Sequence, residues 1–303
     1  MKRILALAVI VGGCLFLIPI FIVYASGYQR ESLLVQLDIQ GQAKEEVPSD
    51  IMDEKTLIGI LAKEIPYTNE MEAIKVQAIV TRTYMARRIL GIQSKGALVG
   101  YTDKEMKELW EDDYERIYKI YQEAVQKTAN QMIFYNNQPI EALYHTASGG
   151  RTRDASEIYH QEIAYLKSVE SNVDNISKQI EYTKEEMSQL LIEAYPDLIV
   201  DVAQIENQIQ IVEKDEADYI KSLQVGNMTI DGEKFRQLLG LPSSNFKIFT
   251  SGERIIFDVR GIGHGVGLSE NGANELAKQG MMCEDIIKYY YTDVSIEKFE
   301  AQR

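Results

Sequence analysis

The first strong pattern is a run of apolar and small residues from Ile4 to Tyr24, preceded by Lys2 and Arg3. About 20 such residues are enough to cross the hydrocarbon core of a membrane. The two basic residues predict a cytoplasmic N-terminus, so the rest of the chain would lie on the outer side of the cell membrane. Residues 1–27 are therefore predicted to hold a short cytoplasmic end and a single-pass transmembrane helix.

Two alternatives for this segment stay open. The letters YASG at 24–27 are similar to a weak signal-peptide cleavage site, and VGGC at 11–14 is similar to a lipidation site at Cys14. The apolar run is longer than the core of a usual signal peptide and continues well beyond Cys14, which favours an uncleaved anchor. Residues 28–56 are polar and irregular and predict a linker. Residues 57–300 are left for the main domain.

A helix that ends at a carboxylate is predicted next. Apolar residues recur at helical spacing from Leu57 to Ile65, and Asp53 stands where it would cap the first turn. Pro66 stops the helix because proline has no backbone N–H for the hydrogen-bond ladder. Glu64 therefore lies beside a break in the chain. Most glutamates at helix ends are solvated surface groups, so this position alone does not make Glu64 catalytic.

A second helix is predicted from Asn69 to about Leu90. Asn69 would cap its first turn, and Glu72, three residues on, would complete a capping box. One side of this helix carries small or slender residues that let another backbone approach closely. These residues are Ile74, Ala78, Thr81 and Met85, with Arg82 beside them.

The next motif is YHTASGG at residues 144–150. It follows a predicted loop over 101–110, a charged helix over 111–130 and a hairpin around the turn at 136–137. A strand that runs into a Gly-Gly turn brings side chains and bare N–H groups to one place. His145 has two open interpretations, a substrate contact or a hydrogen-bonded structural histidine. Ser148 lacks the G-x-S-x-G elbow of a serine hydrolase.

The stretch IAYLKSVES at residues 163–171 predicts a strand. Tyr165 and Lys167 would then share one face, with Leu166 on the other. That face is either a binding surface or a solvated one. Residues 174–241 predict further short helices and strands, including a helix with a capping box from Thr183, but contain no catalytic signature. We predict that they form a subdomain or insertion.

A glycine stands at every second position in GIGHGVGLS, residues 261–269, after a predicted strand over 254–260. An extended strand of this kind would have one bare face against which a backbone or a sugar ring could press. The spacing is not G-x-G-x-x-G and no lysine follows, which argues against a phosphate loop. His264 in this segment is a candidate substrate contact. A helix is predicted from the end of this segment to Lys278.

Charge and cysteine content exclude several classes of protein. The net charge of −14 argues against nucleic acid as a main partner, because phosphates would be repelled. Cys14 and Cys283 are the two cysteines, and Cys14 lies in the predicted anchor. The main domain therefore has neither an internal disulfide nor a four-cysteine zinc site.

Several of these segments resemble motifs of the stage II sporulation protein D family. The run EIPYTNEMEAIKVQAIVTRTYMARR, residues 64–88, resembles the opening motif, in which an acid and a proline turn precede an "EALKAQAVAARTY"-like helix. Residues 145–150 are similar to "HSTSGG", and residues 163–171 resemble "PYLKSV". Residues 261–273 resemble "GWGHGVGMSQYGA", with Ile262 in place of the tryptophan and Glu270-Asn271 in place of Gln-Tyr. The resemblance covers roughly residues 57–299.

The resemblance implies an α+β fold of mixed helices and antiparallel strands around a substrate cleft. It also implies a membrane-anchored peptidoglycan lytic transglycosylase that acts in spore engulfment. Glu64 would be the catalytic acid, and glycan would be gripped by residues at the other motif positions. These are Arg82, His145, Ser148, Tyr165, Lys167 and His264.

Partners and cofactors follow from the same resemblance. The implied partners are glycan strands, an amidase that strips stem peptides, and other engulfment membrane proteins. Some family members bind zinc through the motif histidine and nearby cysteines, but Arg151 and Glu157 stand at those cysteine positions here. No metal or other cofactor is therefore expected.

Cleavage without water needs one acid. It protonates the leaving oxygen and then, as a carboxylate, removes the proton from the muramic C6 hydroxyl, which attacks the sugar carbon. A conventional glycosidase would need a second carboxylate at a defined separation. Partial burial would help Glu64 to hold its proton near neutral pH. The alternative is a non-enzymatic enhancer of a cell-wall amidase, which would not need an acid at this position.

Overall fold

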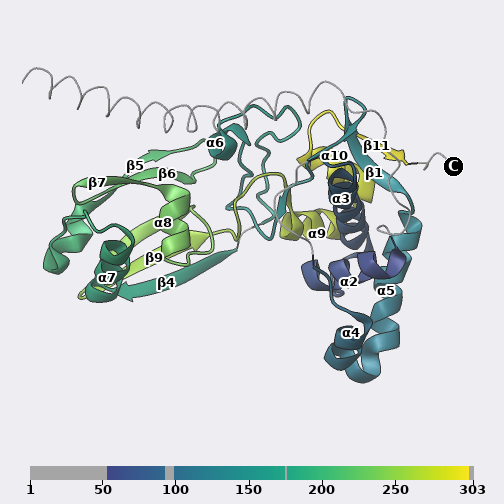
Figure 1. Ribbon diagram of the computed structural model, residues 1–303, viewed down its shortest axis with the longest axis horizontal. Helices are drawn as coiled ribbons and strands as arrows, with labels where there is room; N and C mark the ends of the chain where they lie inside the picture. The colour runs from purple at the N-terminus through teal and green to yellow at the C-terminus, as the bar shows by residue number, and fades with distance from the viewer. Residues whose placement is uncertain (1–52, 93–98, 175, 300–303) are drawn as a thin grey trace, which may run out of the picture. The chain divides into compact units, whose positions relative to one another are not determined.

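The computed structural model describes residues 53–92, 99–174 and 176–299 (Figure 1). All of these residues belong to one compact unit. The predicted transmembrane helix and most of the predicted linker lie outside the described residues. No helix among those described is long and apolar enough to cross a membrane.

Helix α3, Met71–Ile89, is the centre of the first hydrophobic region. It packs against α2, α5, α9, α10 and strand β1. Ile74, Ala78 and Thr81 are fully buried, as the small-residue pattern predicts. The surrounding helices are α2 (Glu54–Glu64), α4 (Asp103–Trp110), α5 (Tyr114–Lys127), α9 (Glu270–Lys278) and α10 (Cys283–Tyr290).

The break between α2 and α3 forms where it was predicted. The cap of α2 is confirmed, but that of α3 is not. Asp53 caps α2 by accepting a hydrogen bond from the Lys55 N–H. The predicted capping box at Asn69 is wrong, because α3 begins at Met71 and has no side-chain cap. Glu72 instead pairs with Lys75 and accepts a hydrogen bond from the backbone N–H of Cys283, at the start of α10. Glu72 thus contacts the distant helix α10 and does not form the predicted capping box with Asn69.

The predicted loop over residues 101–110 is also wrong. Thr102 and Glu105 form a capping box, and α4 follows as a regular helix. A short 3₁₀ helix, η2 (Glu111–Asp113), separates α4 from α5. The long helix predicted over 111–130 is therefore α5 alone, and the hairpin follows it as predicted, with Asn136 and Asn137 at positive φ.

Two small sheets follow, and the second contains residues of the histidine and glycine motifs. Strand β1 (Gln131–Tyr135) pairs with β2 (Gln138–Pro139) and with β11 (Ser295–Lys298), both antiparallel. Strand β3 (Tyr144–His145) pairs in parallel with β10 (Leu268–Ser269). Because residue 144 pairs with residue 268, the histidine motif and the glycine motif lie side by side although more than a hundred residues separate them.

A second hydrophobic core lies between two antiparallel sheets. One sheet has the order β4-β9-β8 and the other β5-β6-β7. Helix α8 (Gly232–Leu238) lies between them in Figure 1, and its Phe235 ring stands 5.9 Å from that of Phe246 and 6.0 Å from that of Phe257. The strands are β4 (Ser177–Thr183), β5 (Ile209–Lys214), β6 (Ile220–Val225), β7 (Met228–Asp231), β8 (Phe246–Ser251) and β9 (Arg254–Arg260).

Two predicted strands do not form in this part of the chain. Residues 198–203, one of the short strands predicted within 174–241, instead lead into a 3₁₀ helix, η3 (Val202–Gln208). Residues 163–171 form turns and a single bridge at Glu170, after the short helix α6 (Ser156–Tyr159). The helix with the Thr183–Glu186 capping box is confirmed as α7 (Lys184–Ala194). The predicted subdomain 174–241 contributes to the second core together with β8 and β9, and its status as an insertion stays a prediction.

The glycine motif is not an extended strand. Gly261, Gly263, Gly265 and Gly267 all have φ between +75° and +110°, so alternate residues turn through the left-handed region that favours glycine. The close backbone approach is nevertheless present. A Cβ at Gly263 would meet the Cβ of His145 at 2.7 Å, and one at Gly267 would meet the carbonyl oxygen of Leu143 at 2.1 Å.

Replacing Gly267 by alanine is therefore expected to destabilise the fold by about 2–3 kcal/mol, from left-handed strain and the backbone collision together. Gly240 supplies the matched control, because it has φ +56° and open space around its Cβ position. Gly240→Ala should cost about 1 kcal/mol, from strain alone. Urea unfolding of both variants measures the difference, and equal losses would contradict the role of close packing at Gly267.

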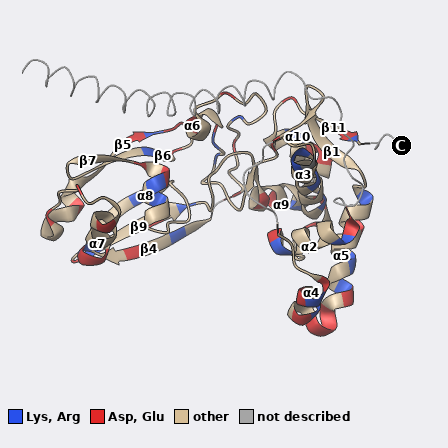
Figure 2. Cartoon of the chain, viewed as in Figure 1, with Lys and Arg blue, Asp and Glu red and all other residues tan. Residues whose placement is uncertain are grey.

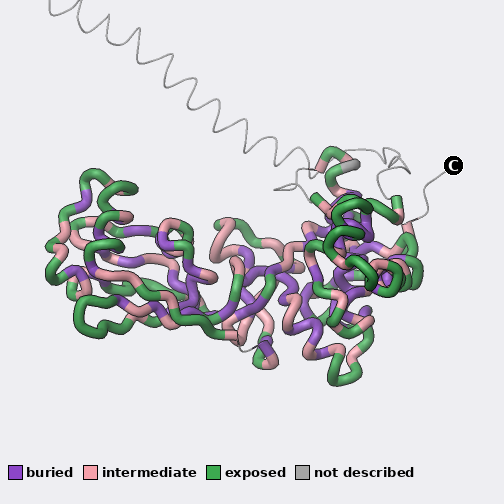
Figure 3. The backbone as a smooth tube through the Cα atoms, turned by 90° about the horizontal axis from the view of Figure 1, so that it is seen from below, coloured by how far each residue is buried: buried purple, intermediate pink, exposed green. Residues whose placement is uncertain are grey.

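The observed architecture is mixed α and β, as predicted. Pairing is antiparallel in every named sheet of the described chain except β3-β10. Buried and exposed stretches alternate along the tube in Figure 3. Acidic residues gather at the end of α4 and in η2, which follows it (Figure 2).

Candidate active site

Glu64 is the last residue of α2 and is partly buried. Its Oε2 atom accepts a hydrogen bond of 2.7 Å from the hydroxyl of Tyr144, on β3. The break after Glu64 is held in place because Tyr121 of α5 donates a 2.7 Å hydrogen bond to the carbonyl of Ile65. The carboxylate is thus fixed from both sides, at its own oxygen and at the backbone that follows it.

Tyr144 links this carboxylate to the histidine motif. Burial raises the pKa of the Tyr144 hydroxyl far above its usual value, and the hydrogen bond to Glu64 raises it further. The hydroxyl therefore keeps its proton and acts as a donor at physiological pH. Sequence reasoning placed Tyr144 within the motif but assigned it no role.

A second carboxyl group, Glu270, lies close enough to interact with Glu64. It is the first residue of α9, immediately after the glycine motif. Burial raises the pKa of Glu270 to about 8, the negative charge of Glu64 contributes to this rise, and a hydrogen bond from Thr146 partly opposes it. The Oε1 atom of Glu270 is buried and has no hydrogen-bond partner among the described residues. Glu270 thus favours its protonated form at neutral pH.

Asp174 holds the two motifs together beneath these acids. It is fully buried and accepts hydrogen bonds from the backbone N–H of Ser148 at 2.5 Å, from Asn271 Nδ2 at 2.9 Å and from the Ser269 hydroxyl. One carboxylate therefore fixes the turn of the histidine motif and the start of α9. Because α9 carries Glu270, this contact also sets where the second acid stands.

The two motif histidines lie against each other. Their ring centroids are 5.7 Å apart. Nδ1 of His145 contacts the carbonyl of Val266 at 3.2 Å, and Nδ1 of His264 accepts a 3.0 Å hydrogen bond from the Val266 N–H. Burial lowers the pKa of His145 to about 3 and that of His264 to about 4, so both rings are neutral at physiological pH. The Nε2 atom of His145 is buried without a partner.

Ser148 and Arg82 are both buried, in different surroundings. The hydroxyl of Ser148 has no hydrogen-bond partner in the described chain. Arg82 donates to the carbonyls of Gln131 and Val125 and to the Thr128 hydroxyl, at the end of α5, and burial lowers its pKa to about 10. These contacts brace α3 against α5, and they do not involve the group around Glu64. A role for Arg82 in binding glycan stays a prediction.

Tyr165 and Lys167 do not lie on a common strand face. The hydroxyl of Tyr165 accepts a 3.0 Å hydrogen bond from the Glu141 N–H, and its ring lies 5.4 Å from that of Tyr135. Lys167 forms ion pairs with Asp154 at 3.2 Å and Glu162 at 2.5 Å. The two side chains therefore do not share a strand face, which was the structural argument for their binding glycan. Contact of either residue with glycan stays a prediction.

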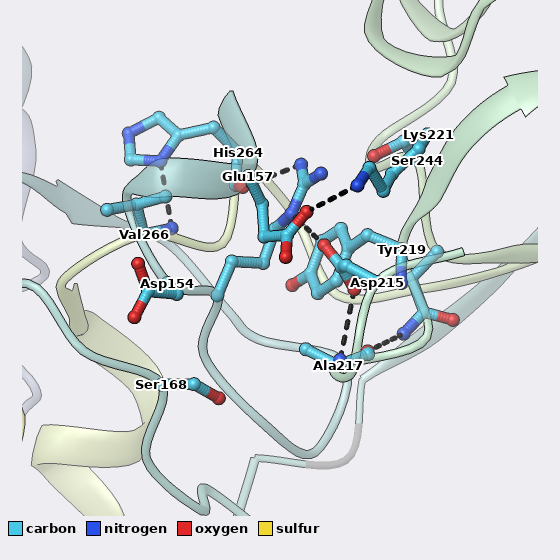
Figure 4. A network of polar contacts seen from close by, with 12 residues as sticks. Asp154, Glu157, Ser168, Asp215, Ala217, Tyr219, Lys221, Ser244, His264 and Val266 are labelled. Atoms are coloured by element: carbon cyan, nitrogen blue, oxygen red, sulfur yellow. Dashed lines mark hydrogen bonds and ion pairs between the residues drawn. The ribbon is translucent and has the colours of Figure 1, made fainter. Parts of the chain in front are cut away.

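A buried ion-pair network joins the histidine motif to the second core. Arg153 pairs with Asp215 and with Glu233, each at 2.6 Å, and its guanidinium lies 4.7 Å from the ring centre of Tyr219. A 3.4 Å hydrogen bond from Arg153 to the carbonyl of His264 connects the same group to the glycine motif. Figure 4 shows His264 and Val266 on one side of this network and Asp215, Tyr219 and Ser244 on the other.

The arrangement can support acid–base chemistry. It brings together two carboxyl groups and a protonated tyrosine from segments that are remote in sequence. No group of three or more His, Cys, Asp or Glu side chains placed to hold a metal ion occurs in residues 53–92, 99–174 and 176–299.

Comparison with known proteins gives consistent matches. The family model described as SpoIID, stage II sporulation protein, matches residues 42–135. The stage II sporulation protein D of Bacillus subtilis is 34% identical over 82% of this chain and 75% of its own length, and that of Bacillus amyloliquefaciens is 32% identical over the same shares. An amidase enhancer of Bacillus subtilis is 21% identical over 80% of this chain and 40% of its own length.

Proposed function

Because the chain belongs to the stage II sporulation protein D family, we propose that it is a peptidoglycan lytic transglycosylase that cleaves glycan strands during spore engulfment. The bond cut joins N-acetylmuramic acid to N-acetylglucosamine. The observation that carries this proposal is the Glu64 carboxyl group, held at the α2–α3 break by the Tyr144 hydroxyl. Its partners would be glycan strands, a stem-peptide amidase and other engulfment membrane proteins.

In the proposed reaction Glu64 first donates one proton and then accepts one proton. Protonated Glu64 gives its proton to the glycosidic oxygen as the bond from that oxygen to the muramic C1 breaks. The Glu64 carboxylate then takes the proton of the C6 hydroxyl while that oxygen bonds to C1. The products are a free N-acetylglucosamine hydroxyl and a 1,6-anhydromuramic end, and no water is consumed.

Neutral hydrogen-bonding groups beside Glu64 suit an uncharged sugar chain. Tyr144 donates to Glu64 and leaves the other carboxyl oxygen for the substrate. The His145 and His264 rings of the two neighbouring motifs are neutral, so they would bring no charge near the substrate. We place the domain on the outer side of the cell membrane, anchored through residues 1–27, where it would meet the cell wall.

The proposal is tested with the purified full chain, incubated with peptide-free glycan strands and, in parallel, with intact peptidoglycan. Mass spectrometry should find 1,6-anhydromuramic ends in the digest of at least one substrate. Reducing muramic ends, which contain an added water, would mean a hydrolase instead. Products from the peptide-free strands alone would mean that stem peptides must be removed first.

The second candidate is a non-enzymatic amidase enhancer, and the similarity to the Bacillus subtilis amidase enhancer favours it. An enhancer would bind glycan and raise the rate of a wall amidase while releasing no sugar ends. Adding the chain to an amidase reaction in the same experiment separates the two. Stimulation without any glycan product would replace the transglycosylase proposal.

A further inference from the structure

Glu270 is a partly buried acid that the one-acid mechanism does not use. It stands where the family pattern has glutamine, so this chain carries one more carboxyl group than the pattern requires. Its Oε1 atom is buried and has no hydrogen-bond partner among the described residues, while the carboxyl group accepts a hydrogen bond from the Thr146 hydroxyl. A carboxyl group with one buried, unpartnered oxygen favours its neutral form.

The β3-β10 pair brings Glu270 near Glu64. Leu268 of β10 pairs with Tyr144 of β3, Glu270 follows two residues later, and the Tyr144 hydroxyl donates to Glu64. The titratable groups that act on Glu270 are Glu64 at the end of α2, Tyr144 and Tyr291 after α10, and none of these three can carry a positive charge. Tyr291 is committed to the carbonyl of Leu143, to which its hydroxyl donates at 2.8 Å. Two negative charges would therefore meet in this site with no cation from the described residues between them.

We propose that Glu64 and Glu270 work as a carboxyl pair that holds one proton, and that Glu270 acts through Glu64 as a positioning residue for that proton. This inference rests on the proposed function of Glu64 as the acid. Two neighbouring, partly buried carboxyl groups do not both ionise readily, so the pair keeps one proton at a pH where a lone carboxyl group has lost its own.

The pair assists both halves of the reaction. In the first half, the shared proton is available to Glu64 at neutral pH and passes to the glycosidic oxygen. Both carboxyl groups are then ionised, and their repulsion makes Glu64 a stronger base. In the second half, Glu64 takes the proton of the C6 hydroxyl, so the pair again holds one proton and the balance is closed.

Glu270→Gln tests the pair because glutamine keeps the shape and removes the titrating group. The alkaline limb of the pH–kcat profile is expected to move at least about one unit lower, so that kcat falls about tenfold at pH 8 and stays close to wild type at pH 5. KM should change less than about twofold. Glu275→Gln, on the same helix and in a surface pair with Lys278, is the control and should leave the profile unchanged.

A titration decides the inference independently of activity. In the full chain labelled with ¹³C at glutamate carboxyl groups, one signal should titrate near pH 8, disappear in Glu270→Gln and move to lower pH in Glu64→Gln. Absence of a glutamate titrating above about pH 6, or a Glu270 signal unmoved by Glu64→Gln, overturns the pair. If the wild type cuts no glycan, the proposed function fails, while this titration still decides whether the pair exists.

Discussion

Glu64→Gln is expected to slow the release of 1,6-anhydromuramic ends by at least about 100-fold, because general acid–base groups typically contribute 10²–10⁴-fold. Glutamine can still accept the hydrogen bond from Tyr144, so the site should keep its shape while losing its proton. Binding of glycan strands should therefore stay within about threefold of wild type, since the loss falls on the chemical step rather than on substrate affinity. Single-turnover rates measured by mass spectrometry, beside a glycan pull-down, provide both numbers.

The matched control is Glu54→Gln, at the other end of the same helix. Glu54 accepts surface hydrogen bonds from Gln122 and Gln126, so its charge has no part in the proposed reaction. Full activity in Glu54→Gln with loss in Glu64→Gln would locate the acid. If Glu64→Gln kept its activity, the acid would have to lie elsewhere, and Glu270 would become the first residue to test in that role.

Local sequence patterns predicted helices and strands correctly where the interactions that fix the element lie within the segment itself. Pro66 ends α2, and Asp53 caps it. Strand β9 covers residues 254–260 as its alternation predicts. The failures occur where a distant partner satisfies the same groups. Asn69 does not cap α3, and the Glu72 carboxylate that would complete its capping box accepts a hydrogen bond from the Cys283 N–H of α10 instead.

The glycine motif shows a different limit. Its spacing predicts close approach by another backbone, which is observed, but also an extended strand, which is not. Alternate glycines fit a strand with a bare face as well as a chain that turns at every second residue. Only the contact with Leu143 and His145 distinguishes these two conformations. That contact depends on the pairing of β3 with β10, which are more than a hundred residues apart in the sequence.

The candidate site was predicted in part for the same reason. Local sequence places Glu64 at the helix break, and the family resemblance supplies its proposed role as the acid. Tyr144, Glu270 and Asp174 join it through the parallel β3-β10 pair and the hydrogen bonds beneath, which no local pattern reveals. One feature of the sequence could have drawn attention to Glu270. It directly follows the glycine-rich segment 261–269, where the small residues allow close packing around an acid.

Arg153→Met is expected to destabilise the fold by about 3–5 kcal/mol, because it leaves the buried Asp215 side chain without its cation, while Glu233 keeps its ion pair with Arg236. Arg153 and Asp215 are 2% and 1% exposed, and Glu233 is the second acid of the network. Thermal unfolding should show a melting temperature about 10 °C lower, given the usual scaling for a domain of this size. The exposed pair between Arg254 and Glu181 supplies the control, and Arg254→Met should cost less than about 1 kcal/mol.

The size of the Arg153→Met effect should depend on pH in a defined direction. Burial already raises the pKa of Asp215 above its usual value, although Arg153 and backbone N–H groups oppose the rise. Without Arg153 the carboxyl group becomes easier to protonate, and its protonated form removes the unpaired charge. The gap in stability between variant and wild type should therefore narrow as pH falls from 7.5 towards 5. A gap that stayed constant over this range would mean that lost packing on Tyr219, rather than charge, accounts for the destabilisation.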